Sequence, residues 1–234
     1  MAEPATAMPA AGVSAAVGLS ACWMAFRDGA KLAWHRGRAP EFRWLFGLSA
    51  AVVLVTAGVE RSLGAGLAAN RTLYIMASFV LPLGAFASAR LFTRNQRLDH
   101  SVWCLARYGA SRRVTALGLI TGAGLLMAAA ASVLVGAGLG VTYGGSPGLL
   151  ADVWTSTWIA ALGAFSYMTW FLVASGWGKA GRWRWLPLVL DFTIGTGTGW
   201  AAACLPRAPL AHLLGSSELL GLSQQQSTAW LVAS

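Results

Sequence analysis

Asp191 is the one clear ionisable residue well inside an apolar stretch of this sequence. A carboxylate at membrane depth costs free energy unless it is paired or hydrated, so such a residue is a candidate proton relay or cation ligand. Asp191 also follows the basic residues Arg182 and Arg184 by only about two helical turns. An ion pair with either arginine would make the carboxylate structural. We expect this structural role, and a role in transport or proton transfer stays the alternative.

Other residue types that carry out catalysis or bind metals are sparse and widely spaced. None of the three histidines has an Asp or Glu at helical ligand spacing, and the three cysteines share no close spacing. The sequence has no HExxH, GxSxG, CxxC or Walker-type phosphate-binding motif. Gly195-Thr-Gly-Thr-Gly199 resembles a nucleotide-binding loop, but no strand precedes it, so we interpret it as a helix-packing element. We therefore predict no catalytic residue, no metal site and no cofactor bound by this chain.

The longest polar interval, residues 93–113, separates two apolar stretches. Its middle predicts a short amphipathic helix with Val102, Leu105 and Tyr108 on one side. The turn Gly109-Ala-Ser-Arg-Arg113 then runs directly into the next apolar stretch. A short helix held between two membrane spans can transmit motion from a soluble partner, or it can simply lie on the membrane surface.

The composition is that of a membrane protein. Hydrophobic residues make up 56% of the chain and charged residues 11%, against roughly 25% charged in a soluble domain. Stretches of about 18–20 apolar residues cross a hydrocarbon core of roughly 30 Å as helices. The sequence predicts five such spans, at residues 42–59, 72–92, 114–140, 152–175 and 185–205. The predicted fold class is therefore an all-α polytopic membrane protein, with a partial sixth span left open at the C-terminal end.

The segments outside these spans differ in character. Residues 1–20 are predicted to be disordered, and residues 21–38 to form an interfacial helix with aromatic residues opposite a basic stripe. Residues 206–234 contain no stretch of 18 apolar residues, which indicates an interfacial or re-entrant tail. Three pairs of glycines have the spacing GxxxG, and we favour packing within the chain over a dimer face for them. These pairs are Gly118 and Gly122, Gly136 and Gly140, and Gly195 and Gly199.

The positive charge is unevenly distributed. The formal net charge is +9, and all of the 17 Lys and Arg residues except Arg61, Arg71 and Arg207 fall on one side of the predicted spans. The positive-inside rule then places the N-terminus in the cytoplasm and, with five spans, the C-terminus outside. The basic residues lie in short clusters between apolar runs, which excludes a nucleic-acid-binding domain and indicates contact with anionic lipid.

This order of elements resembles that of the permease subunits of type-2 ABC exporters, which are ATP-binding-cassette transporters. The resemblance covers about residues 20–234 in layout, from the basic interfacial helix to the re-entrant helices after span five. The family's coupling helix often opens with an acidic-Gly-Thr pattern, which Arg97-Leu-Asp-His-Ser101 matches in part. Family members usually finish with a sixth span. Here the sequence stops where that span would start, so we expect a shortened variant or a helix supplied by another subunit.

The resemblance implies a non-enzymatic permease in the cell membrane (the inner membrane), most similar to exporters. It implies two partners, a second permease chain in a homo- or heterodimer and cytoplasmic ATPase subunits that bind ATP. The contacts with the ATPase would come from residues of the 93–113 segment, namely Asp99, Trp103, Arg107, Tyr108, Ser111 and Arg112. A non-transporting scaffold or assembly subunit is the alternative. The substrate is not specified, because a Leu/Ala/Gly-rich lining suits lipid, glycan or peptide alike.

Overall fold

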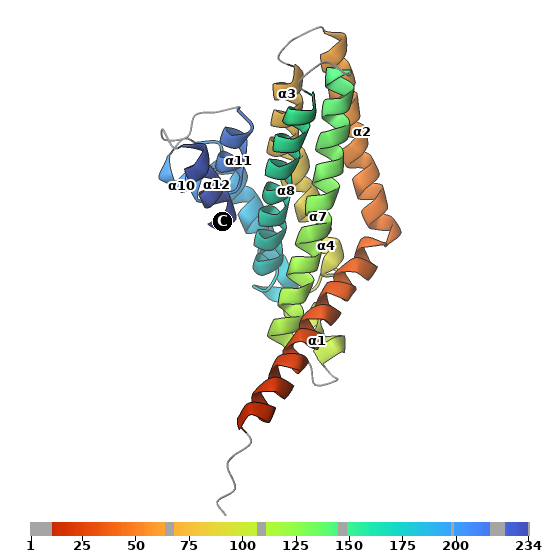
Figure 1. Ribbon diagram of the computed structural model, residues 1–234, viewed down its shortest axis with the longest axis vertical. Coiled ribbons are helices and arrows are strands. Elements are labelled where there is room, and N and C mark those ends of the chain that lie inside the picture. The colour runs from red at the N-terminus through yellow and green to blue at the C-terminus, as the bar shows by residue number, and fades with distance from the viewer. Residues whose placement is uncertain are drawn as a thin grey trace, which may run out of the picture.

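The computed structural model describes residues 11–63, 68–106, 111–144, 149–197, 199–215 and 223–233. These ranges are helical and contain no strand (Figure 1), which confirms the all-α class for them. The long helices are α1 (Ala11–Gly37), α2 (Pro40–Ser62), α7 (Arg112–Tyr143) and α8 (Leu149–Ala174). The shorter ones are α3 (Ala68–Ile75), η1 (Met76–Val80), α4 (Leu81–Phe92), α5 (Leu98–Ser101), α6 (Trp103–Ala106), η2 (Lys179–Arg184), α9 (Trp185–Thr193), α10 (Trp200–Ala203), α11 (Arg207–Leu213) and α12 (Gln224–Ala233).

Four helical segments are long and apolar enough to cross a membrane. They are Pro40–Ser62, Arg71–Phe92, Arg112–Tyr143 and Leu150–Ala174, and they match the first four predicted spans. The second of them is a continuous run of α3, η1 and α4. The four pack as one upright bundle in Figure 1, with α7 and α8 at its centre. The chain is therefore a multi-pass helical membrane protein.

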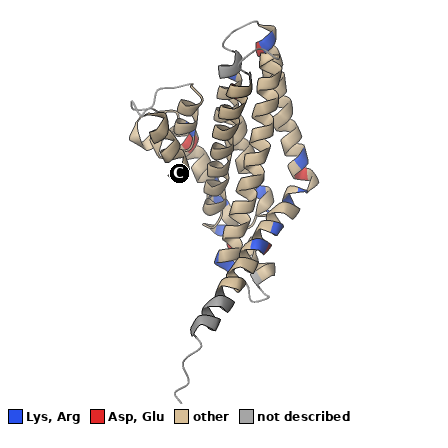
Figure 2. Cartoon of the chain, viewed as in Figure 1, with Lys and Arg blue, Asp and Glu red and all other residues tan. Residues whose placement is uncertain are grey.

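We call one end of this bundle the basic end. It is the end at which α2 begins, α4 ends, α7 begins and α8 ends, at the bottom of Figure 1. Figure 2 shows most of the described Lys and Arg residues in the lower half of the view, around α1 and the ends of the spans. The unequal charge distribution predicted from the sequence is therefore present in the folded chain.

The helix α1 begins earlier and packs more closely than the sequence predicts. It starts at Ala11, whereas disorder was predicted up to residue 20; residues 1–10 lie outside the described ranges. Instead of lying alone in the headgroup layer, α1 crosses the foot of α7 (Figure 1). A Cβ on Gly118 would overlap the backbone carbonyl of Phe26, and one on Gly29 would overlap that of Thr115. These glycines let the two backbones touch, which accounts for one of the three GxxxG pairs.

A sharp elbow joins α1 to α2. Ala39 is extended, with φ −60° and ψ 144°, because the ring of Pro40 excludes the helical conformation from the residue before it. Pro40 itself suits the first turn of a helix, where its missing N–H has no partner to lose. The elbow turns the chain from the foot of α7 into the first span.

The helix α2 lies at the edge of the bundle. Only 11% of its spanning window is buried, against 56%, 44% and 50% for the other three spans. Its exposed side chains include Trp44 and Leu48, at 80% and 65%. Apolar residues on such a surface face lipid tails or another membrane protein. The core lies instead between α4, α7 and α8, where the ring of Phe171 contacts those of Phe86 and Tyr167.

The predicted fifth span is not a single helix. α9 ends at Thr193, and residues 194–197 form turns and a bend before the short helix α10 (Trp200–Ala203). At 1.5 Å per residue, α9 covers about 13 Å, less than half of a hydrocarbon core of roughly 30 Å. Gly195 to Gly197 do not belong to a helix, so the interpretation of this stretch as a helix-packing element is wrong for them. Alternating Gly and Thr are poor helix formers. The described part of the tail, α10 to α12, lies beside α8 in Figure 1.

A matched pair of alanine substitutions tests the α1–α7 contact. Gly118→Ala places a methyl group against the backbone of α1, and overpacking of this kind costs about 1–3 kcal/mol. Gly136→Ala in the same helix meets nothing within 4 Å and gains up to about 1 kcal/mol of helix propensity. Thermal unfolding of the detergent-purified proteins should show a lower melting temperature for Gly118→Ala only. Equal melting temperatures for the two variants would contradict the contact.

Candidate functional site

The 93–113 segment leaves α4 through a tight turn at the basic end. Arg94 and Asn95 both have positive φ, at 51° and 58°. Asn tolerates this left-handed conformation, whereas Arg adopts it rarely, so contacts with neighbouring groups must stabilise the turn. One such contact is local, since Arg90 Nε donates to Asn95 Oδ1 at 2.9 Å. The others come from distant parts of the chain.

Arg36 of α1 holds the segment from one side. Its Nη1 donates to the carbonyl oxygen of Phe92, and its Nη2 donates to that of Ser101 at 2.9 Å. Phe92 is the last residue of α4 and Ser101 the last of α5, where helical carbonyls lack intrahelical partners. One guanidinium therefore caps two helices and fixes the segment to α1.

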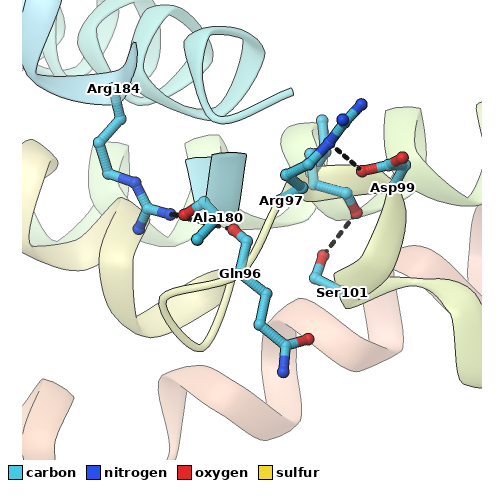
Figure 3. Close-up of polar contacts among 7 residues, drawn as sticks. Gln96, Arg97, Asp99, Ser101, Ala180 and Arg184 are labelled. Carbon is cyan, nitrogen blue, oxygen red and sulfur yellow. Dashed lines mark hydrogen bonds and ion pairs between the residues drawn. The ribbon is translucent and has the colours of Figure 1, made fainter. Parts of the chain in front are cut away.

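Arg184, at the end of the loop between α8 and α9, holds the segment from the other side. It is 5% exposed, and its Nη1 donates to Thr93 Oγ1 at 3.0 Å. Its Nη2 donates to the carbonyl oxygens of Gln96 at 3.0 Å and Ala180 at 3.4 Å, as Figure 3 shows. The amide of Leu98 adds a backbone bond to the carbonyl oxygen of Ser175 at 3.2 Å. The segment is thus bonded to both the α1 side and the α8–α9 side of the bundle.

Glycine makes the contact between the Arg184 loop and the 93–96 turn possible. Gly181 has φ 66°, and a Cβ there would lie 2.9 Å from the carbonyl oxygen of Gln96 and 2.6 Å from Arg184 Nη2. Any other residue would push the two loops apart. Gly178, with φ 74°, is equally restricted because a Cβ would overlap the ring of Trp183.

The predicted coupling helix is two four-residue helices, α5 and α6, with a break at Val102. Of the predicted apolar side, Val102 is fully buried, Leu105 is half-buried, and Tyr108 lies outside the described residues. Leu98, which was not part of that prediction, is also buried, at 9% exposed. The break explains the difference in length, since Val102 at φ −103° and ψ 0° leaves the helical region. Arg107 and Tyr108, both predicted contact residues, lie outside the described residues.

The remaining predicted contact residues lie close together at the basic end. Asp99 accepts a bond from Arg97 Nε at 3.1 Å, and both side chains are nearly half exposed (Figure 3). Trp103 is 43% exposed, and the Arg112 guanidinium stacks 4.1 Å from the centre of its ring. Ser111 precedes α7, and its carbonyl accepts from Thr115 Oγ1 at 3.0 Å. The structure therefore places an aromatic and charged surface on a segment whose inner side is fixed.

The two anchoring arginines sit in a positive environment. Burial, together with the nearby charge of Arg94, lowers the pKa of Arg36 to about 10. Burial and the charge of Arg90 also lower the pKa of Arg184. Both groups remain cationic at neutral pH, so their bonds to backbone carbonyls are charge-assisted and stronger than neutral ones. The sequence identified Arg36 only as part of the positive side and Arg184 also as a possible partner of Asp191. Their actual partners were missed, because a partner distant in sequence leaves no local pattern.

Asp191 has different partners from those expected. Its carboxylate accepts a hydrogen bond from Tyr167 Oη at 2.9 Å and one from the backbone N–H of Arg207 at 3.3 Å. The side chain is 1% exposed. Arg184, one of the two predicted ion-pair partners, is directed to the 93–96 turn, and Arg182 is exposed in its loop. The basic residue near Asp191 is instead Arg207, which follows the break in the fifth span.

The Arg207 side chain is buried without a direct ion pair. It is 5% exposed, and its guanidinium lies 4.4 Å from the ring centre of Phe192 and 5.7 Å from that of Phe79. Within the described ranges no carboxylate oxygen lies within 4.0 Å of it, and Nη1 has no hydrogen-bond partner. Arg207 Nη2 donates to the carbonyl oxygen of Ser78 at 3.0 Å. The cation is therefore held by aromatic faces and one carbonyl.

Proline in the second span makes that carbonyl available. In a regular helix the Ser78 carbonyl would accept from the amide four residues later, which is Pro82 and has no N–H. The helix widens here into the π-helical turn η1, and such turns are frequent at functional positions. The freed carbonyl accepts from Arg207, so the tail is bonded to the second span at the level of Asp191. In the sequence, the sign of this bond was that Pro206 and Pro209 flank Arg207, the one Lys or Arg of the tail.

The contacts described here join helices and loops that are far apart in the chain. In the described ranges no group of three or more His, Cys, Asp or Glu residues could hold a metal ion. The Asp191 cluster has its carboxylate bonded to Tyr167 and Arg207, which favours the structural role expected from the sequence.

Hydrogen exchange tests the anchoring of the 93–113 segment. Arg184→Met removes charge-assisted bonds worth about 2 kcal/mol, which should speed amide exchange at residues 96–98 by roughly thirtyfold. Arg182→Met, two residues away and exposed, is the matched control and should leave that exchange unchanged. Unchanged exchange in Arg184→Met would show that the arginine does not fix the segment.

A double-mutant cycle tests the buried cluster. Asp191→Asn leaves the Arg207 cation buried near a neutral amide, and Arg207→Met leaves the carboxylate without a nearby cation. Each variant should lower the unfolding free energy or folded yield. The unfolding free energy of the double variant should fall by about 1–3 kcal/mol less than the sum of the two single-variant losses. Additive losses would mean that Asp191 and Arg207 do not stabilise each other.

Comparison with known proteins identifies no relative: the chain matches no family model, no curated protein and no solved structure.

Proposed function

We propose that this chain is the permease subunit of an ABC transporter, most similar to an exporter, driven by separate cytoplasmic ATPase subunits. The observation that carries the proposal is the double anchoring of the 93–113 segment. Arg36 bonds it to α1 and Arg184 bonds it to the loop before α9. A segment that only lies on the membrane surface needs no such bonds.

The anchoring supports a route for motion. A displacement of α5 and α6 reaches α4 and α7 through the chain itself, since the segment joins those two spans. It reaches α1 through Arg36 and the end of α8 through Arg184. Because packed helices move as rigid bodies, a push on this segment would shift the spans together. This is the mechanical role that a coupling helix performs.

The exposed side of the segment suits a protein partner. Trp103 and Arg112 form a stacked aromatic and cationic pair, and Trp and Arg are enriched among residues that dominate binding energy. Asp99 and Arg97 add a polar rim. The positive-inside rule places this basic end in the cytoplasm, where an ATPase would reach it.

Two further features support a transporter over a rigid anchor. The fifth helix is broken beyond Asp191, and broken helices are typical of transporters, where they line the translocation path. The exposed apolar side of α2 suits a second permease chain, as a homo- or heterodimer needs. A non-transporting scaffold subunit would share the membrane bundle, and it would have no need for an ATPase.

Co-purification tests the proposal. Trp103→Ala with Arg112→Glu should weaken the capture of an ATPase from native membranes while membrane insertion stays intact. Single surface charges contribute about 1 kcal/mol or less, so the combined change is the sharper probe. The control Trp154→Ala with Arg61→Glu makes the same two exchanges at exposed positions at the opposite end of the bundle and should retain the ATPase.

The opposite results are equally clear. An unaltered chain that purifies from native membranes with no ATPase would exclude the transporter and favour the scaffold. Equal loss of the ATPase in both double variants would mean that the 93–113 segment is not the contact.

A further inference from the structure

An open cavity of about 650 Å³ lies at the basic end, between the α1–α2 elbow and the end of α4. Its polar lining comes from His35 and Arg36 of α1, Glu41 of α2, and Arg90, Arg94 and Asn95 around the α4 terminus. Three of these are arginines and one is acidic. The cavity is open to the outside, and it lies where the first span begins, at the level of the lipid headgroups.

The positive charge in this cavity exceeds the negative charge, since three arginines and one glutamate, Glu41, line it. Among the described residues, no carboxylate oxygen lies within 4.0 Å of Arg36, Arg90 or Arg94. The Arg36 Nε is buried and has no hydrogen-bond partner within the described ranges. Like charges held together in this way raise the free energy of the fold unless an anion joins them.

Backbone carbonyls at the end of α4 supply only a small part of that negative charge. Leu91 O accepts from the amide of Arg94 at 3.0 Å, and Arg90 O accepts from the amide of Asn95 at 2.9 Å. The carbonyl of Phe92 already accepts from Arg36. The partial negative charge of the helix terminus is therefore engaged in the turn itself.

The arginines near this end of the chain repel one another. The charge of Arg94 lowers the pKa of Arg36, after the larger effect of burial. The charge of Arg90 acts in the same direction on Arg184. An anion in the cavity would reverse this effect and so would be bound more tightly the closer it lay to the guanidinium groups.

We propose that this cavity is a binding site for a phosphate group. Phosphate oxygens accept paired N–H bonds from guanidinium groups, which is why arginine predominates where phosphate is bound. The headgroup of an anionic phospholipid and a free phosphate ion share this chemistry. Arg90 and Arg94 are not among the predicted ATPase-contact residues, whereas Arg94 and Asn95 belong to the same 93–113 segment.

Binding to the full chain in detergent, after delipidation, tests the site. Native mass spectrometry would measure the retention of phosphatidylglycerol and phosphatidylcholine, and calorimetry the binding of inorganic phosphate. We expect phosphatidylglycerol to bind about tenfold or more tightly than phosphatidylcholine, and Arg90→Gln with Arg94→Gln to abolish the difference. As a control, Arg27→Gln with Arg182→Gln removes the same charge at exposed positions outside the cavity. This variant should keep the preference for phosphatidylglycerol.

Each result has one meaning. Arginine-dependent binding of phosphatidylglycerol supports the site with a lipid ligand, and arginine-dependent binding of inorganic phosphate supports it with a soluble one. Equal losses in the two double variants, or no preference over phosphatidylcholine and no phosphate binding, would overturn the proposal. Melting temperatures show whether the variants fold, and Arg94→Gln alone, at an exposed turn position, replaces the double variant if that one does not.

Discussion

The organisation of this protein depends on arginine side chains that bond to backbone carbonyls at helix ends. A helix terminus leaves carbonyl groups without partners, and at the edge of a membrane a guanidinium satisfies several at once. Arg36 bonds the ends of α4 and α5, and Arg184 bonds the turn between them. Without these bonds the 93–113 segment would be a loop between two spans. With them, its inner side is bonded to α1, α4 and the loop before α9, as the proposed coupling role requires.

The same type of bond recurs at membrane depth, where it joins the broken fifth helix to the second span. Pro82 frees the carbonyl of Ser78, and Arg207 donates to it from beyond the break. Arg207 also donates its backbone amide to Asp191, whose other partner is Tyr167 of α8. A non-helical backbone is tolerated at this depth only where protein or water surrounds it. The cluster therefore allows the chain to turn back beside α8 instead of completing a span.

The sequence predicted the parts of this structure that depend on local composition. Four spans, the basic end and the buried side of Val102 follow from apolar length, charge and periodicity, and all three are present. The fifth predicted span is not one continuous helix, because hydropathy measures how apolar a stretch is, whereas Gly and Thr decide whether it stays helical. The partners of Asp191 and the roles of Arg36 and Arg184 were not predictable from spacing, because each joins residues that are far apart in the chain. The contact residues Arg107 and Tyr108 stay predictions, since they lie outside the described ranges.

Photo-crosslinking from the 93–113 segment tests the proposed coupling role most directly. A photoreactive residue in place of His100, an exposed position on α5, would be activated in native membranes and its adducts identified by mass spectrometry. The same residue in place of Trp154, exposed at the opposite end of the bundle, is the control. We expect position 100, and not position 154, to capture a protein that binds ATP. Adducts at position 100 that contain only lipid, or only proteins without a nucleotide site, would contradict the account.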